Sequence, residues 1–387
     1  MTTTDLHPVT AGRDHSIDVV RAIAVVGVVG GHWLVTGLVI GDGGAWHQAS
    51  PLRAMPGLAP VSWFFQTLAL LFFAGGFGAG RRRDPGSGAG RRSRPGPFAL
   101  SAYRQHHSEA APRRRGALRK LALPVAVLLA GWAVVLLVAT LADVPWGTRR
   151  TIAMLVISPL WFLLPYLALR AVTQPLARAV DRVGPLPLVA PGIALVALSD
   201  AGLAPLWLAV PAAWSVPWIL GIAVARRGRS SLPARTLIVA GVAAMAALVL
   251  ILDYPASAVG VPGDGRSNLS PPSLFAVALG LAQIGLYLII AGRAGRLDRG
   301  SPNGVVRSLN RAALPIYLGH QSVLVATTGV AALIAGGPVD GLLSAPTGPH
   351  WIITRLAWLP FLALVLAGLI RVAWPTTRRS RGGLVRD

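Results

Sequence analysis

An arginine and a histidine interrupt an apolar stretch near the start of the chain, Ser16–Leu34, which reads SIDVVRAIAVVGVVGGHWL. Arg21 and His32 are 11 residues apart. In an α-helix this spacing is three turns plus about 20°, so both side chains lie on one face, roughly 16–17 Å apart along the axis. If Arg21 lies near one edge of a hydrocarbon core about 30 Å thick, His32 lies near its middle. An ionisable side chain at that depth is costly and indicates a functional site.

His32 is suited to two kinds of group-transfer chemistry. A neutral imidazole can take a proton from a hydroxyl and return it, or it can itself be acylated as a nucleophile. The alternative is a buried histidine that is hydrogen-bonded to a neighbouring helix. Gly30 and Gly31 leave the backbone open to a substrate or to another helix, and the Gly27–Gly31 pair has the spacing of helix packing.

Arg21 could bind the anionic part of a donor molecule. Asp18 precedes it by three residues on the same face and could hold the guanidinium in place. A held arginine at the mouth of a site suits a phosphate or pantetheine-type donor. The alternative is that Arg21 is an anchor whose charged end reaches the membrane surface.

The composition predicts an all-α integral membrane protein. Of 387 residues, 53% are hydrophobic and only 13% are charged, and the mean hydropathy is +0.60. The net charge of +22 could suggest a nucleic-acid partner, but the arginines are confined to loops between apolar segments. There is no cysteine, which excludes disulfides and thiolate chemistry. The polar first residues and the lack of a small-residue cleavage site argue against a removable signal peptide.

We predict about ten transmembrane helices, each near the 20 residues that span a bilayer. The segments are 17–40, 59–80, 120–141, 151–172, 185–203, 205–225, 234–252, 273–292, 311–336 and 351–373. The fifth is the weakest, because three prolines crowd its start. The predicted domains are a cytoplasmic segment 1–16, a transmembrane domain 17–373 that includes an Arg-rich loop 81–119, and a basic tail 374–387.

The distribution of basic residues predicts that both termini are cytoplasmic. With this orientation, 31 of the 36 Arg and Lys residues fall on the inner side, and the outer side has only Arg53, Arg149, Arg150, Arg266 and Arg355. We therefore expect a multi-pass protein of the cell (plasma or inner) membrane. The Arg-rich loop is interpreted chiefly as a topogenic segment that binds anionic headgroups. The alternative is an electropositive collar for a phosphorylated cytoplasmic ligand.

Five segments together resemble membrane-bound acyltransferase family 3. The first is DVVRAIAVVGVVGGHWL, with its Arg-x10-His pattern. WFFQTLALLFFAGGF at 63–77 is similar to the family's second helix, with glycine (Gly75 or Gly76) in place of the usual serine, as in an actinobacterial-type variant. PLWFLLPY at 159–166, NLSPPSLFAVALGLAQ at 268–283 and NRAALPIYLGHQSV at 310–323 resemble the fourth, eighth and penultimate helices. The resemblance covers nearly the whole chain in order.

The resemblance implies an O-acyltransferase that moves an acyl group, often acetyl, from acyl-CoA to a hydroxyl. By position it implies His32 as catalytic base or acyl relay and Arg21, with Asp18, as the donor contact. Tyr317 and His320 share one helix face at a depth comparable to that of His32, and they form a possible secondary site. A structural hydrogen bond to another helix is the favoured role for them. Asn268 is a candidate lining residue of the outer mouth; the alternative is a turn residue ahead of two prolines.

The remaining expectations concern ligands and rival functions. His47, His106, His107 and His350 are read as solvent-exposed loop residues. No permanently bound cofactor and no metal are expected; acyl-CoA is the donor substrate, and the acceptor is a carbohydrate, a lipid or glycolipid of the cell envelope, or a secondary metabolite. A secondary transporter or exporter is the main alternative, although no internal repeat is evident. A non-catalytic membrane scaffold is the second alternative function.

Overall fold

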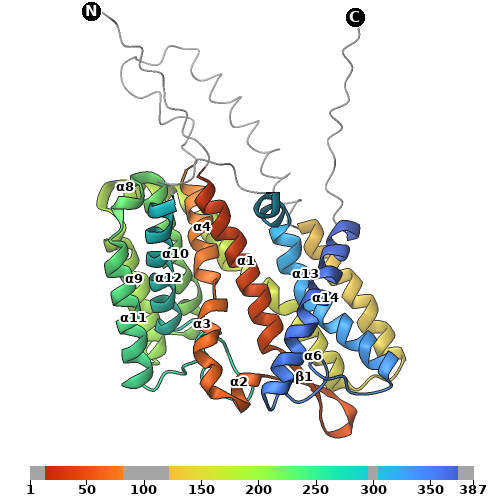
Figure 1. The fold of residues 1–387 in the computed structure, drawn as a ribbon. Coiled ribbons are helices and arrows are strands. Elements are labelled where there is room, and N and C mark those ends of the chain that lie inside the picture. The colour runs from red at the N-terminus through yellow and green to blue at the C-terminus, as the bar shows by residue number, and fades with distance from the viewer. Residues whose placement is uncertain (1–13, 82–121, 295–303, 374–387) are drawn as a thin grey trace, which may run out of the picture.

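The computed structural model describes residues 14–81, 122–294 and 304–373, and almost all of its regular structure is helical (Figure 1). The predicted segment 1–16 lies mostly outside the described residues, and the Arg-rich loop and basic tail lie almost entirely outside them. Most of the helices run roughly parallel to one another in Figure 1. In chain order they are α1 (His15–Val35), α4 (Leu68–Gly80), Ala122–Leu141, α6 (Trp146–Ile157), α7 (Leu163–Ala171), α8 (Thr173–Val183), α9 (Leu186–Asp200), α10 (Leu206–Arg227), α11 (Ala234–Leu250), α12 (Leu274–Ala294), α13 (Gly304–Ala335) and α14 (Pro349–Ala373).

Within the described ranges, eight helices are long and apolar enough to cross a membrane. Helices α8 and α9 are bent by 119° relative to each other and would make a ninth span if they count as one. Helix α11 is a shorter apolar helix. All ten predicted segments therefore contain helix, and the chain is a helical membrane protein. By length and composition, however, the described residues provide eight or nine spans.

The first predicted segment extends too far, because its last residues form a strand. Helix α1 ends at Val35, and β1 (Gly37–Ile40) pairs antiparallel with β2 (Trp46–Ala49). The hairpin contacts the start of α6, where Thr148 Oγ1 accepts a hydrogen bond from the Trp46 amide at 2.9 Å. We call this end of the bundle the hairpin face, and the end at which α1 begins the Asp14 face.

The second predicted segment is a broken helix. It consists of a 3-10 turn (Pro56–Val61), the single turn α3 (Ser62–Phe65) and α4, with Gln66 and Thr67 outside helical geometry. The Gln283 side chain of α12 donates to the carbonyl oxygens of Trp63 and Gln66, both at 2.9 Å. A break inside a membrane is tolerated when freed backbone groups find partners in this way.

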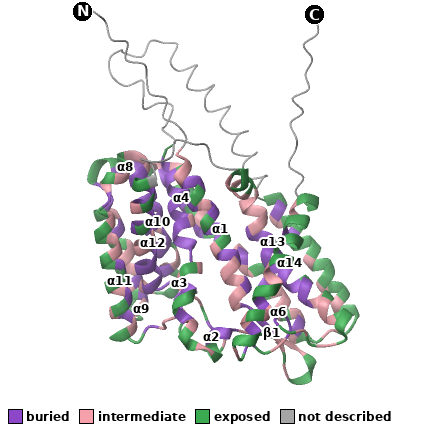
Figure 2. Ribbon diagram, in the orientation of Figure 1, coloured by how far each residue is buried: buried purple, intermediate pink, exposed green. Residues whose placement is uncertain are grey.

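The interior core lies where α4, α10 and α12 meet, and the peripheral helices are mainly exposed (Figure 2). Glycines allow the close approach of α4 and α10. A Cβ on Gly76 would overlap the backbone of Trp218, and one on Gly75 would lie 2.7 Å from the Trp218 ring. This contact explains why both positions of the small-residue triplet are glycine. The exposed apolar side chains of Ala122–Leu141 and α14 suit contact with lipid tails.

Candidate active site

Helix α1 lies between α4 on one side and α13 on the other, near the centre of the molecule (Figure 1). The small residues on α1 make the fit possible. A Cβ on Gly27 would overlap the Thr67 side chain, and one on Gly31 would lie 2.9 Å from the Phe65 Cβ. The Gly27–Gly31 pair therefore accommodates the break between α3 and α4, and the open backbone beside His32 is covered by protein.

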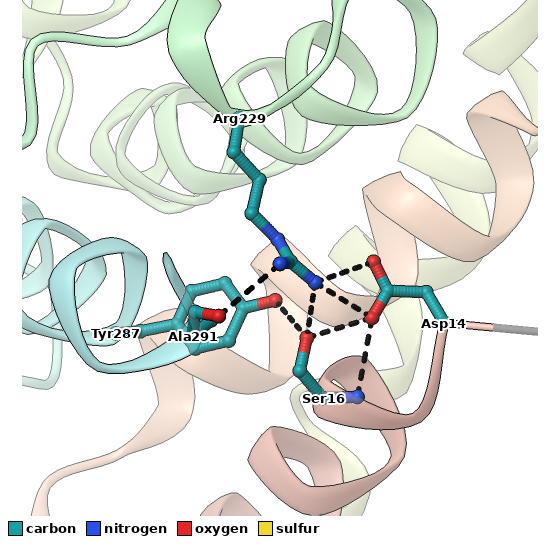
Figure 3. Close-up of polar contacts among 5 residues, drawn as sticks. All are labelled: Asp14, Ser16, Arg229, Tyr287 and Ala291. Carbon is teal, nitrogen blue, oxygen red and sulfur yellow. Dashed lines mark hydrogen bonds and ion pairs between the residues drawn. The ribbon is translucent and has the colours of Figure 1, made fainter. Parts of the chain in front are cut away.

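The Asp14 end of α1 is held by a polar cluster of four side chains from separate parts of the chain (Figure 3). Asp14 caps the helix by accepting from the Ser16 amide at 3.1 Å. Arg229, which follows α10, donates to both Asp14 carboxylate oxygens at 2.7–2.8 Å and to Ser16 Oγ at 2.7 Å. Tyr287 of α12 shares a 2.8 Å hydrogen bond with Ser16 Oγ. These contacts fix where α1 begins relative to α10 and α12.

The other end of α1 is held by a buried arginine that sequence reasoning placed among the outer arginines. Arg355 is fully buried within α14, donates from Nη2 to the Thr36 carbonyl at 2.7 Å, and lies 4.7 Å from the centre of the Trp351 ring. Thr36 is the C-cap residue of α1. A cation near a helix C-terminus complements the helix dipole, so Arg355 stabilises α1 from the end nearer His32.

His32 and His320 face each other between α1 and α13. Their ring centroids are 5.0 Å apart with an interplanar angle of 56°. The two helices are also linked next to these rings, because the Trp33 side chain donates from Nε1 to the His320 carbonyl at 2.9 Å. The structure therefore brings together two of the residues singled out in the sequence, from near opposite ends of the chain.

The hydrogen bonding of His320 defines its tautomer. Nδ1 lies 2.7 Å from the carbonyl oxygen of Tyr317, one turn earlier in α13. A carbonyl only accepts, so Nδ1 carries the hydrogen and Nε2 presents its lone pair. Nε2 is buried and has no hydrogen-bond partner among the described residues. Within the part of the chain that the structure describes, the His320 side chain therefore lacks the expected hydrogen bond to another helix, and its unpaired acceptor belongs to the ring beside His32.

Gln321 is the site residue that sequence reasoning missed. Its Nε2 lies 2.9 Å from His32 Nδ1, and its Oε1 is buried without a partner in the described ranges. A carboxamide can turn either its N–H or its oxygen toward an imidazole, so Gln321 controls which His32 nitrogen carries the hydrogen. The only signal available in the sequence was its position next to His320.

Tyr317 packs beside the histidines through its ring. It is buried, with its centroid 5.7 Å from that of His320 and 4.1 Å from that of Phe162. Phe162 precedes α7 directly. The aromatic contact closes the site on the side of α7, so Tyr317 shapes the site and orients His320 through its backbone carbonyl.

Arg21 and Asp18 lie on α1 near the Asp14 face, away from the histidines along the helix. Arg21 Nη1 is 4.0 Å from Asp18 Oδ1, and the Arg21 side chain is 31% exposed. Asp18 is buried, and its backbone carbonyl accepts from Asn310 of α13 at 2.7 Å. The pair therefore has the predicted i,i+3 contact and leaves part of the guanidinium accessible.

Asn268 is part of a different region of the hairpin face. Its amide nitrogen donates to the carbonyls of Pro255 and Ser257 at 2.6 and 2.8 Å, and its oxygen accepts from Ser273 at 2.7 Å. These bonds organise the segment between α11 and α12. The same segment holds Tyr254, whose pKa is raised by burial and by its hydrogen bond to Asp200. The geometry of Asn268 matches the turn-residue alternative.

The structure describes two of the four histidines that were predicted to be exposed loop residues, and neither is in a loop: His47 lies in β2, and His350 lies in the first turn of α14. His47 and His350 are exposed. His106 and His107 lie outside the described residues. Among residues 14–81, 122–294 and 304–373, no three His, Cys, Asp or Glu side chains gather into a group that could hold a metal ion.

Comparison with known proteins gives one match. The sequence model of the acyltransferase 3 family, described as an acyltransferase domain, matches residues 14–377, nearly the whole chain. No curated protein and no solved structure gives a significant match. The match favours an acyltransferase over the transporter and scaffold alternatives, because it covers α1, α13 and every helix between them. The chain therefore belongs to the acyltransferase 3 family and is an acyltransferase.

Proposed function

We propose that this acyltransferase is a membrane-bound O-acyltransferase that moves an acyl group, acetyl being the expected one, from acyl-CoA to a hydroxyl of a carbohydrate, glycolipid or secondary metabolite. The observation that carries the proposal is the pair formed by the half-buried His32 and the buried His320, with ring centroids 5.0 Å apart, in a chain of an acyltransferase family. Acyl transfer to a hydroxyl needs a group that takes the hydroxyl proton, and imidazole is suited to that task.

In the direct route His32 acts as a general base. It takes the proton of the acceptor hydroxyl as the oxygen attacks the thioester carbonyl. The new ester forms, the carbon–sulfur bond breaks, and the proton passes to the CoA thiolate, so CoA–SH leaves. Nε2 of His32 is free to accept that proton when Gln321 turns its amide oxygen toward Nδ1–H.

In the relay route His32 is the nucleophile. Its nitrogen attacks the thioester, CoA leaves as the thiol, and the acyl-imidazole then passes the acyl group to the acceptor hydroxyl. The lone pair on His320 Nε2 would receive the hydroxyl proton in that second step. Label recovered on an α1 peptide after a quenched reaction supports the relay, whereas label found only on the acceptor supports the direct route.

The donor is proposed to approach from the Asp14 face, where the partly exposed Arg21 could bind its phosphates. A guanidinium pairs well with phosphate, and Asp18 would hold it in position. In the proposed orientation this face and both termini are cytoplasmic, and the protein resides in the cell membrane. The Arg-rich loop 81–119 would concentrate the anionic donor there.

The experiment that tests the proposed function compares cells lacking the gene with cells that express the wild-type chain. Membranes from each are incubated with labelled acetyl-CoA, and the lipid and glycan fractions are analysed by mass spectrometry. We expect an ester-linked acyl group that depends on the chain and is released by mild base. Equal labelling of both sets of membranes would contradict the proposal.

A further inference from the structure

An open cavity of about 800 Å³ lies at the hairpin face between the helix Ala122–Leu141 and α6. Ser270, from the segment between α11 and α12, contributes to the same wall. Arg149 of α6 donates to Thr140 Oγ1 at 2.6 Å and thereby joins the two helices at the mouth of the cavity. A space of this size is comparable to the pockets that hold small-molecule ligands.

The lining changes character along α6. Near the start of the helix it is cationic and polar, with Arg149, Arg150 and Thr140. One to two turns further, roughly 6–10 Å along the axis, it is mainly apolar, with Met154 and Ile157 before Ser158. This gradient matches a molecule with an anionic head and an apolar tail.

The two arginines differ in whether their guanidinium groups already have partners within the protein. Arg149 is hydrogen-bonded to Thr140 and lies over the Trp146 ring, with 5.6 Å from its guanidinium carbon to the ring centroid. Arg150 is exposed and has no hydrogen bond or ion pair with any residue in the described ranges. A guanidinium without a partner at the head of an apolar groove is available for a phosphate.

The Trp161 wall of the cavity is connected to the histidine site through aromatic side chains. Trp161 lines the cavity, and its neighbour Phe162 packs on Tyr317 with 4.1 Å between ring centroids. Tyr317 in turn contacts His320, which faces His32. The contacts that lead from the cavity wall to His320 therefore run through Phe162 and Tyr317, and the acceptor hydroxyl must pass these two side chains to reach His32.

We propose that the cavity is the binding site of the acyl acceptor, and that the acceptor is a membrane amphiphile with a phosphate-bearing head. Its head lies against Arg149 and Arg150, and its apolar chain lies along α6. That the bound molecule is the acyl acceptor rests on the proposed acyl transfer. The binding site itself can be tested without that activity.

The test uses the purified full-length chain and phosphatidylglycerol as the probe, with retained lipid measured by native mass spectrometry. Arg150→Gln should weaken phosphatidylglycerol binding about tenfold or more, since it removes a charge-assisted hydrogen bond. Ala153→Trp, which fills the cavity and leaves both arginines, should also weaken it. The matched controls are Arg53→Gln, an exposed arginine of the same face outside the cavity, and Ala246→Trp on the exposed side of α11.

A second measurement connects the cavity to the reaction. Added phosphatidylglycerol should inhibit labelling of the native acceptor by the wild-type chain, and Arg150→Gln should reduce that inhibition. Wild-type lipid binding by both Arg150→Gln and Ala153→Trp would overturn the site. Binding without inhibition would show an annular lipid only and overturn the acceptor role. Loss of labelling in every chain, with selective binding retained, would instead contradict the proposed function.

Discussion

The rings of His32 on α1 and His320 on α13 lie 5.0 Å apart between centroids, and Gln321 is hydrogen-bonded to His32 Nδ1 at 2.9 Å. Two consecutive residues of α13 thus act on one histidine of α1. One offers an unpaired nitrogen, and the other controls the position of a hydrogen. In the proposed mechanism, this arrangement would let α1 and α13 move the proton together.

Replacing His320 should lower turnover more than donor affinity. His320→Phe keeps an aromatic ring against Tyr317 but removes the free Nε2, so kcat should fall by about 100-fold or more while the KM for acyl-CoA changes little. The measurement is steady-state kinetics with a thermal unfolding scan of each variant. An unchanged kcat in a folded His320→Phe protein would restrict His320 to packing.

Replacing Gln321 should change how His32 is used. Gln321→Leu removes the hydrogen bond to Nδ1 and should lower kcat about tenfold. Gln321→Glu places a carboxylate beside the imidazole and favours its protonated form, so the acidic limb of the kcat/KM pH profile should move to higher pH. A structural role alone predicts similar losses in both variants with no movement of the profile.

Arg21→Ala should raise the KM for acyl-CoA by about 10- to 100-fold, because a charge-assisted contact to the donor is lost. Arg21→Lys should recover part of the affinity, since it keeps the charge but not the two-pronged geometry. Arg53→Ala, on the opposite face, is the control and should leave KM unchanged. Equal KM values for Arg21→Ala and the wild type would refute the donor role.

The glycine contact between α4 and α10 should dominate the stability of the core. A Cβ on Gly221 would overlap the Phe73 carbonyl oxygen, so Gly221→Ala should destabilise the fold by roughly 1–3 kcal/mol or more. Gly131→Ala, where a Cβ meets no atom within 4 Å, should leave the unfolding temperature unchanged or slightly higher. The same unfolding temperature for both variants would contradict this interpretation of the packing.

Sequence periodicity predicted where the helices lie, because it depends on local patterns, and it placed Arg21 and His32 on α1. The roles of these two residues are still predictions. The contacts made by His32 could not be predicted in this way, because Gln321 and Arg355 act through tertiary packing. Arg355 looked like an outer-side arginine, but it is buried against Thr36. The strand at 37–40 was missed because an apolar run extends past Val35 without a break in hydropathy. The break at Gln66 and Thr67 depends on Gln283 from a distant helix.

The most direct test of the central claim is the acyl transfer activity of His32→Ala measured beside His350→Ala, whose histidine is exposed in the structure. Both proteins are purified, compared with the wild type for thermal unfolding, and assayed with labelled acetyl-CoA and envelope extract as the acceptor source. The account predicts that His32→Ala folds normally and transfers no label above background, while His350→Ala keeps wild-type activity. Transfer at the wild-type rate by His32→Ala would contradict it.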